Sequence, residues 1–401
     1  MIGNNEMPKP EIEIKEFESR PTSEITATDA QLIQAEYSGK LDISRPLLGS
    51  GYILKASGWV GRIELENSCI SIQPKVPIIN LFWMLERAYK EIIQLKGKVD
   101  ISSLTALNES LMGILASKSL DLASQALYRS YINCNDTIPC LRGRIDINEI
   151  LKTMRNCSPN LPCNFQEHTS DILENRAITW VLWSLSRIGI KRDEIRKKVF
   201  RTFHIYSGAA DIERVSSEQL RHVKYNRLTE RYRLVHALCL FFLENMGPLH
   251  GPGGREFVPF LIDMEGVYEK YVAEALKLKM PHPFLVSKQE TRFFDDSRWL
   301  RIRIDIVMRN SESNKIIAVL DTKYKIHEMP DMSDIFQIFS YAQSTGANNA
   351  ILIYPWTGID EKPYYFKGCR IIPLGIDVSN EDMDKAENDL TEKIVKILEE
   401  H

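Results

Sequence analysis

One passage constrains the folding of this chain more than any other. Residues 246–260, MGPLHGPGGREFVPF, are rich in glycine and proline, which interrupt helices and strands alike. The hydrophobic pattern also differs on the two sides of this passage. We therefore place a domain boundary at residue 250 and expect separate structural modules before and after it.

Before this boundary, two hydrophobic patterns follow one another. Short alternating runs, namely LDIS, GYILKA, WVGRIELE and CISIQPKV, are separated by Gly, Ser, Asn and Pro. This pattern is typical of short strands. From Asn80 onward, apolar residues recur at helical spacing, as in NLFWMLERAYKEI. The sequence therefore predicts a β-rich module over residues 1–79 and a mainly helical middle region over residues 80–250.

After the boundary, the pattern alternates between helix and strand. It predicts a helix at VYEKYVAEALKLK (267–279), strands at RIRIDIVM (301–308) and KIIAVLDTKYK (315–325), a helix through SDIFQIFSYAQS (333–344) and a strand at NAILIYPW (349–356). Helix, hairpin, helix and strand form a mixed α/β unit with a short central sheet. We predict an α/β domain over residues 251–401 and an α+β multidomain fold for the whole chain.

The composition is that of a soluble globular protein, with 44% hydrophobic and 26% charged residues. The net charge of −3 gives no bulk attraction to nucleic acid but does not exclude a local basic groove. No run approaches the ~20 apolar residues of a membrane helix. The first residues, MIGNNEMPKPEIEIKEF, lack the basic start and apolar run of a signal peptide. We therefore expect a cytoplasmic protein without a membrane partner.

Seven cysteines are spread along the chain. Without a secretion signal, reduced and mostly buried thiols are expected. Four of these cysteines form two pairs with five residues between the members of each pair: Cys134 and Cys140, and Cys157 and Cys163. Structural zinc sites usually have two to four residues between paired ligands. A zinc site at these four residues is therefore an alternative to free thiols.

Three charged side chains lie on two predicted strands. Asp305 is in RIRIDIVM, and Asp321 and Lys323 are in AVLDTKYK, sixteen residues further on. The polar turn RNSESNK between them predicts that the strands pair as a hairpin. Because side chains alternate along a strand, Asp321 and Lys323 project on one face. With Asp305 on the neighbouring strand, two carboxylates and one ammonium can converge on one point.

This set of groups suits phosphodiester hydrolysis. Mg²⁺ prefers oxygen ligands, keeps several waters and binds substrate phosphate. The metal stabilises charge on the phosphate and lowers the pKa of a bound water, and a neighbouring lysine can orient that water. An Asp-x-Lys tripeptide alone is more typical of a solvated strand end. Its position directly after the buried run IIAVL, where α/β sheets carry their sites, favours a functional role.

The order Asp305, then Asp321-Thr322-Lys323, resembles the PD-(D/E)XK nuclease motif, with Ile304 in place of the usual proline. The resemblance implies that Asp305 and Asp321 bind Mg²⁺, for which Mn²⁺ can substitute. It also implies that the Thr322 carbonyl is a further ligand and that Lys323 positions or activates the attacking water.

Two further features resemble the RecB-type branch of these nucleases. Gln337 and Tyr341 stand at i and i+4 on the next predicted helix, share a face, and match the Gln-x-x-x-Tyr signature of that branch. They would support the site or the phosphate. Glu269, in the preceding helix, matches the helical carboxylate that often completes the metal site. The alternatives are an ordinary amphipathic helix and an exposed surface charge.

Most of the chain resembles the McrC family, the nuclease subunit of the McrBC modification-dependent restriction system. The resemblance rests on runs that occur in the family's order: GWVGRIEL (58–65), ISIQPKVPIINLFWML (70–85), LRGRIDINEIL (141–151), FQEHTSDILENRAITWVL (165–182) and FLIDMEGVYEKYV (260–272).

This resemblance implies a partner, a hexameric McrB-like AAA+ GTPase that recognises methylated or otherwise modified DNA and translocates it. It also implies that the amino-terminal half contacts the GTPase and that the carboxyl-terminal half cuts. The chain has no G-x-x-x-x-G-K-[ST] motif, so a partner must supply the nucleotide hydrolysis. The predicted function is that of the DNA endonuclease subunit of a GTP-dependent restriction complex, which docks on and stimulates its GTPase.

Two other functions stay open on the sequence. A self-sufficient RecB-like repair nuclease would degrade DNA without a GTPase. The long amino-terminal region without nuclease residues speaks against it. A regulator with an inert nuclease domain would only stimulate an AAA+ ring, and the intact Asp, Asp and Lys set speaks against that.

Two basic stretches, KRDEIRKKVFRTFH (191–204) and LRHVKYNRLTERYRLVH (220–236), could pair with DNA phosphates. Runs of this kind are more typical of solvated helix faces. Asp171, Asn175 and Arg176, at a predicted helix start, resemble a family landmark. Their position predicts capping and packing roles.

Overall fold

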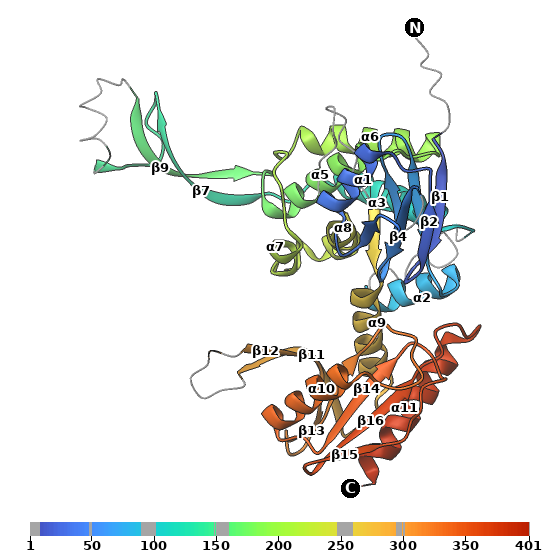
Figure 1. Cartoon of the computed structure of the whole chain (residues 1–401). Helices are drawn as coiled ribbons and strands as arrows, with labels where there is room; N and C mark the ends of the chain where they lie inside the picture. The colour runs from blue at the N-terminus through green and yellow to red at the C-terminus, as the bar shows by residue number, and fades with distance from the viewer. Residues whose placement is uncertain are drawn as a thin grey trace. The chain divides into compact units, whose positions relative to one another are not determined.

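The computed structural model describes residues 9–47, 50–89, 102–147, 149, 160–246, 260–293, 299 and 301–400 (Figure 1). Its contacts divide the chain into two compact units. The first comprises Met1–Leu107, Asn245–Pro248 and Pro259–His401, and the second comprises Asn108–Glu244 and Leu249–Val258. Residues 247–259 of the predicted boundary lie outside the described residues. The division at residues 79 and 250 stays a prediction.

The amino-terminal part of the first unit is rich in strands. One sheet, in the order β1-β6-β5-β10, contains β1 (Glu11–Lys15), β5 (Trp59–Glu64), β6 (Cys69–Gln73) and β10 (Phe260–Asp263). A second sheet, in the order β2-β4-β3, contains β2 (Ser19–Thr22), β3 (Leu41–Ser44) and β4 (Tyr52–Ala56). Helix α1 (Ala27–Glu36) adds Ile33 to the apolar core that both sheets share. The predicted β-rich module is therefore confirmed as part of the fold.

The carboxyl-terminal part of the first unit is built on a six-stranded sheet in the order β11-β12-β13-β14-β16-β15. Its strands are β11 (Phe284–Phe293), β12 (Arg301–Asn310), β13 (Ile316–Thr322), β14 (Asn349–Tyr354), β15 (Tyr364–Phe366) and β16 (Cys369–Gly375). Strands β13, β14 and β16 run parallel, and the other neighbours are antiparallel. Every residue of β14 is buried, as expected for a strand covered on both faces.

Three helices pack on this sheet. Helix α10 (Met332–Thr345) crosses β13, β14 and β16, and it contributes Ile338 and Ala342 to their core. Helix α9 (Met264–Lys279) lies against β11, β12 and β13, and α11 (Met383–Glu399) lies against α9. The predicted order of helix, hairpin, helix and strand is therefore present, with the hairpin formed by β12 and β13. The sequence pattern did not predict α11.

Helix α2 (Ile78–Ala88) follows the amino-terminal strands and packs on α9. It thereby connects the amino-terminal and carboxyl-terminal parts of the first unit. Asn80 Nδ2 donates to the carbonyl of Val378 at 2.8 Å. Arg87 donates to both oxygens of Glu387 on α11, at 3.1 and 2.8 Å, and Trp83 Nε1 donates to the same carboxylate at 3.1 Å. The Glu387 side chain is fully buried. The amino-terminal sheets and the six-stranded sheet are thus fastened together by a buried ion pair.

The second unit contains the helical middle region. Its helices are α3 (Leu104–Ser124), which begins in the first unit, α5 (Leu173–Ser186), α6 (Asp193–Ser207), α7 (Ser217–Arg221), the 3₁₀ helix η2 (Glu230–Tyr232) and α8 (Arg233–Asn245). It also contains a sheet in the order β7-β9-β8, formed by β7 (Ser130–Ile138), β8 (Arg144–Ile145) and β9 (Leu161–Thr169) (Figure 1). The sequence did not predict these strands, because β7 has no fully buried residue and so no apolar alternation marks it.

The family landmark at the start of α5 has a packing role. Arg176 donates to both oxygens of Asp171, at 2.7 and 2.6 Å. Asn175 is buried, donates to the carbonyl of Tyr128 at 3.0 Å and accepts from the Tyr232 hydroxyl at 2.9 Å. The expected capping role is wrong, because the residue that caps α5 is Ile172 and its side chain makes no capping hydrogen bond.

Neither a membrane span nor a zinc site is found in the part of the chain that the structure describes. No helix there is long and apolar enough to cross a membrane. No three His, Cys, Asp or Glu side chains there could hold a metal ion. Cys134, Cys140 and Cys163 are free thiols. Cys157 lies outside the described residues, so zinc binding by the four cysteines remains an alternative.

The buried ion pair between α2 and α11 leads to a first prediction. We expect Glu387→Ala to destabilise the protein by about 3–5 kcal/mol, because it leaves the Arg87 guanidinium without its buried partner. Lys362→Ala is the matched control. It removes an exposed ion pair with Asp360, and such pairs contribute about 0–1 kcal/mol. Calorimetric unfolding of both variants measures the difference. Equal small effects would show that the pair does not hold the unit together.

Candidate active site

The pairing of β12 with β13 brings Asp305 and Asp321 together. The antiparallel register pairs Ile306 with Leu320. One residue further, this register sets Asp305 opposite Asp321, so both side chains project on the same face of the sheet. Asp321 is 1% exposed, and Asp305 is partly buried. Two carboxylates therefore share one largely desolvated position.

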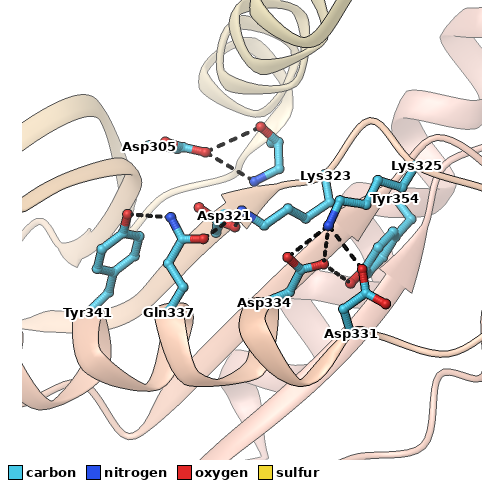
Figure 2. A network of polar contacts seen from close by, with 10 residues as sticks. Asp305, Asp321, Lys323, Lys325, Asp331, Asp334, Gln337, Tyr341 and Tyr354 are labelled. Carbon is cyan, nitrogen blue, oxygen red and sulfur yellow. Dashed lines mark hydrogen bonds and ion pairs between the residues drawn. The ribbon is translucent and has the colours of Figure 1, made fainter. Parts of the chain in front are cut away.

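Lys323 neutralises part of this charge. Its Nζ lies 2.6 Å from Asp321 Oδ2 and donates to Gln337 Oε1 at 2.8 Å (Figure 2). The backbone N–H of Lys323 donates to the carbonyl of Ile353 on β14 at 2.9 Å, which fixes the residue just beyond the end of β13. Within the described residues, Asp321 Oδ2 makes no hydrogen bond of normal geometry besides this ion pair. This oxygen therefore keeps capacity for a further ligand.

The end of β13 also orients Asp305. The backbone N–H of Thr322 donates to Asp305 Oδ2 at 3.2 Å, and the Thr322 hydroxyl donates to the same oxygen at 3.3 Å. Both donors act on one oxygen, and the Asp305 carboxyl also interacts with the neighbouring carboxyl of Asp321. A carboxylate held in this way presents its second oxygen for other contacts.

Helix α10 supplies the two residues that the sequence placed on one face. Gln337 Nε2 donates to the Tyr341 hydroxyl at 2.8 Å, while its carbonyl oxygen accepts from Lys323. The amide is thereby fixed between an ammonium and a phenol, with a defined orientation. The structure thus brings Gln337 and Tyr341 together with Lys323 and Asp321 (Figure 2).

Glu269 on α9 belongs to the same neighbourhood. Gln289 Nε2 donates to Glu269 Oε1 at 3.0 Å. Gln289 lies between Lys288 and Glu290, which pair with Ile306 and Ile304, so its position in β11 is opposite Asp305. Its φ of 53° is uncommon for a residue other than glycine, and such strain concentrates at functional sites. Sequence analysis missed Gln289, because no residue pattern reveals a left-handed backbone at a glutamine.

The acidic groups have raised pKa values. Burial and the neighbouring charge of Asp321 raise the pKa of Asp305 to about 6, although the Thr322 hydrogen bond opposes this. Burial also raises the pKa of Asp321, against the lowering effect of Lys323. The pKa of Glu269 is raised by burial and by the charge of Asp305. Burial lowers the pKa of Lys323, but Asp321 outweighs burial and the net shift is upward. Such clusters are typical of functional sites.

A second charge network braces the loop after Lys323, and sequence analysis missed it. Lys325 Nζ lies 3.0 Å from Asp331 Oδ2 and 3.1 Å from Asp334 Oδ1. The Tyr354 hydroxyl at the end of β14 donates to Asp334 Oδ2 at 3.3 Å (Figure 2). Asp334 is 4% exposed. The network joins the loop, the start of α10 and β14. The sequence did contain a signal for this network, because Lys325 follows Lys323 by two residues and residues two apart in an extended segment share a face.

Tyr324 connects the site to the amino-terminal sheet. Its hydroxyl donates to Glu16 Oε1 at 3.0 Å, and the backbone N–H of Lys75 donates to the same oxygen at 2.6 Å. Glu16 is fully buried, and its pKa is raised by that burial. The residue between Lys323 and Lys325 is therefore held by a carboxylate more than 300 positions earlier. Local sequence patterns carry no signal for such a contact.

The donor set fits Mg²⁺, although it is incomplete by itself. The described residues contain no three His, Cys, Asp or Glu side chains that converge on one metal position. Asp305 and Asp321 do converge, and each has an oxygen with free acceptor capacity. Mg²⁺ commonly uses one or two carboxylates, with waters and substrate phosphate as the remaining ligands. Two aspartates beside a backbone carbonyl are adequate for this coordination.

Several charges of the basic stretches that we considered as DNA contacts have partners within the second unit. Arg196 and Lys197 pair with Asp193. Arg221 pairs with Glu244. Further ion pairs and backbone hydrogen bonds occupy three more arginines: Arg192, Arg231 and Arg233. The structure therefore favours the solvated, ion-paired interpretation for these residues.

Comparison with known proteins identifies the family. The model for the McrBC 5-methylcytosine restriction system component matches residues 54–355, which is more than half of the chain. The protein is thus a component of a restriction system. It belongs to the family of McrBC 5-methylcytosine restriction system components. The comparison with curated proteins gave no match.

Two solved structures resemble the chain. One is a refined half-complex from a tetradecameric assembly of Thermococcus gammatolerans McrB AAA+ hexamers with bound McrC. It is 17% identical, has a TM-score of 0.55, and the match covers 96% of this chain and 100% of that chain. The other is the cryo-EM structure of the Thermococcus gammatolerans McrBC complex, at 19% identity, a TM-score of 0.41, and 66% and 87% coverage. The first confirms the α+β multidomain fold.

The raised pKa values yield a prediction that needs no activity assay. In a chelating buffer, the contribution of Asp305 to stability should fall as the pH rises through the interval between 3.8 and about 6. Over this interval the folded state binds more protons than the unfolded state. Asp305→Asn should remove most of this dependence and raise the melting temperature at pH 8. Asp360→Asn, at an exposed carboxylate, is the control. Unchanged pH dependence in Asp305→Asn would contradict the assignment.

Proposed function

We propose that this chain is the McrC-type subunit of a McrBC-like restriction complex and that it cleaves DNA phosphodiester bonds with Mg²⁺. The observation that carries the proposal is the convergence of Asp305, Asp321 and Lys323 at the end of β13, with Gln337 bonded to the lysine. Family membership supports the biological setting. Two carboxylates and one ammonium are the groups that metal-assisted phosphoryl chemistry requires.

The carboxylates and the lysine have different roles in this proposal. Asp305 and Asp321 hold Mg²⁺ together with the Thr322 carbonyl and, through its closeness to Asp305, Glu269. When bound, the ion supplies positive charge at the scissile phosphate and favours deprotonation of the attacking water. Burial raises the pKa of both aspartates, and the charge of Asp321 raises that of Asp305 further. A cation beside them would favour their charged forms. Two neighbouring carboxylates therefore favour a divalent cation as the ligand of this site.

Lys323 acts as a hydrogen-bond donor. The charge of Asp321 raises the pKa of Lys323 against the effect of burial, which favours the protonated ammonium at neutral pH. Asp321 and Gln337 take up two directions around Nζ, and an ammonium has three donors. The third donor can orient the attacking water or contact a phosphate oxygen. Gln337, itself fixed by Tyr341, positions the lysine for this contact.

The partner follows from the family. The half-complex that resembles this chain contains McrB AAA+ hexamers with bound McrC. The present sequence lacks a G-x-x-x-x-G-K-[ST] motif, so it cannot bind a nucleoside triphosphate through a P-loop. We therefore propose that the chain docks on a hexameric AAA+ GTPase and stimulates it, and that this partner recognises methylated or otherwise modified DNA. Cleavage then depends on GTP.

Asp321→Asn separates cleavage from assembly. We expect cleavage of modified plasmid DNA by the reconstituted complex to fall at least 100-fold, because a ligand of the metal is lost while the side-chain volume is kept. GTP hydrolysis by the partner should still be stimulated to the wild-type level. Plasmid cleavage and phosphate release measured on the same preparation test both statements. Cleavage at the wild-type rate would refute the site, and lost stimulation would refute the separation of roles.

Lys323→Ala and Asp305→Ala distinguish the ammonium from the ligands. Lys323→Ala should lose cleavage but keep Mg²⁺ binding, because removal of a neighbouring positive charge favours a cation. Asp305→Ala should lose both. Calorimetric titration of the full chain with Mg²⁺, together with plasmid cleavage, measures the two properties. If Lys323→Ala weakens metal binding as much as Asp305→Ala does, the lysine has a structural role and not one at the attacking water.

A further inference from the structure

The paired strands β11 and β12 extend past the rest of the sheet at the candidate active site. β12 pairs with β11 from Arg301 to Asn310, but its pairing with β13 covers only Ile306–Arg309. The part of β12 before Ile306 therefore has β11 on one side and no paired strand on the other among the described residues. We refer to residues 289–293 and 301–305 as the ribbon.

One face of the ribbon is positively charged and continuous with the site. Arg301 and Arg303 alternate with Ile302 and Ile304, so they project on the same face as Asp305. Both arginines are exposed, whereas Ile304 is fully buried. Opposite them on β11, Thr291 pairs with Arg303 and Phe293 with Arg301. Among the ribbon's own residues, Asp305 at the inner end is the acidic side chain on this face, and Glu269 of α9 lies beside it at Gln289.

The two guanidinium groups also differ from their neighbours in having no fixed partner. In the part of the chain that the structure describes, Arg301 and Arg303 form no ion pair or hydrogen bond through their side chains. Arg292 and Arg309, by contrast, both bind Glu290, at 2.7 and 2.6 Å. The positive charge of Arg303 acts on Glu269 and lowers the pKa of that carboxyl, against burial and the charge of Asp305. Arg292 and Arg309 therefore have a structural role, whereas Arg301 and Arg303 are available to a ligand.

We infer that the ribbon binds the phosphate backbone of duplex DNA beside the cleavage point, through Arg301 and Arg303. This inference rests on the proposed nuclease function. Side chains on one face of a strand repeat every ~6.6–6.8 Å, so the two arginines begin roughly 7 and 14 Å from Asp305. DNA carries one phosphate per strand for every ~3.4 Å of helix axis, so these distances correspond to roughly two to four nucleotides. The arginines therefore reach flanking phosphates.

Arginine suits this role chemically. The guanidinium is always charged, offers donors in a planar fork that matches phosphate oxygens, and is weakly hydrated. Contacts of this kind fix the register of the protein on DNA without reading sequence. The ribbon would hold the duplex in place while the base sequence or its modification is read elsewhere. The overall negative charge of the chain makes such a local positive face the more necessary for binding.

The test is the salt dependence of binding to a short fluorescent DNA duplex. The full chain is used with Ca²⁺ in place of Mg²⁺, because the larger ion supports binding without the geometry for cleavage. Each phosphate contact contributes about 0.9 to the slope of log affinity against log salt. Raising the salt from 50 to 200 mM lowers the affinity of every form of the protein. This fold-drop should be about 3.5 times smaller for Arg301→Gln or Arg303→Gln than for the wild type, and about 12 times smaller for the double variant.

Three controls make the result specific. Lys367→Gln removes one exposed positive charge at the turn between β15 and β16, at the opposite edge of the same sheet, and should keep the wild-type slope. Arg301→Lys and Arg303→Lys should restore most of it. Because both arginines are exposed and unpaired, circular dichroism and thermal unfolding should not change in either Gln variant.

Four results would overturn the inference. They are a wild-type slope in the double variant, an equal loss in Lys367→Gln, an effect confined to single-stranded DNA, and no duplex binding by the wild type. The proposed function is judged separately, by plasmid cleavage with and without Asp321→Asn. Normal cleavage that depends on Asp321, with unchanged binding in the arginine variants, would refute the ribbon alone.

Discussion

The placement of two like charges opposite each other at a buried strand end is the constraint on which the rest of the site depends. Asp305 and Asp321 face each other across β12 and β13, and burial raises the pKa of both. A hydrophobic pair at these positions would stabilise the sheet, so the arrangement costs stability. Lys323 offsets part of the cost. In the function that we propose, a bound cation relieves the remaining repulsion.

The surrounding structure keeps these charges in position. Gln337 and Tyr341 fix the ammonium from α10, and Lys325 fastens the following loop to Asp334. Tyr324, between the two lysines, is held by Glu16 from the amino-terminal sheet. In the segment 323–325, Lys323 therefore lies in the site, whereas Tyr324 and Lys325 fix the backbone to the surrounding structure. The amino-terminal sheet is therefore part of the scaffold of the site. The resemblance to the family implies one half that docks and one half that cuts, but the contact of Tyr324 with Glu16 joins the two halves structurally.

Local patterns in the sequence predicted the parts that depend on alternation and helical spacing. The hairpin of β12 and β13, the shared face of Gln337 and Tyr341, and the β-rich amino-terminal part follow from such patterns. What the sequence could not predict depends on distant contacts or on unusual backbone geometry. Glu16 contacts Tyr324 from more than 300 positions away, Gln289 depends on a left-handed φ, and strand β7 has no fully buried residue.

The phosphate contacts that we propose lie outside the long basic stretches of the sequence, for a physical reason. In the basic stretches of the second unit, acidic residues at helical spacing pair with some of the cations, as Asp193 does with Arg196 and Lys197. In the ribbon, the cross-strand neighbours of Arg301 and Arg303 are Phe293 and Thr291, which carry no charge. The two arginines therefore form no ion pair among the described residues. A short alternating run can therefore present more usable positive charge to a phosphate backbone than a longer helical one.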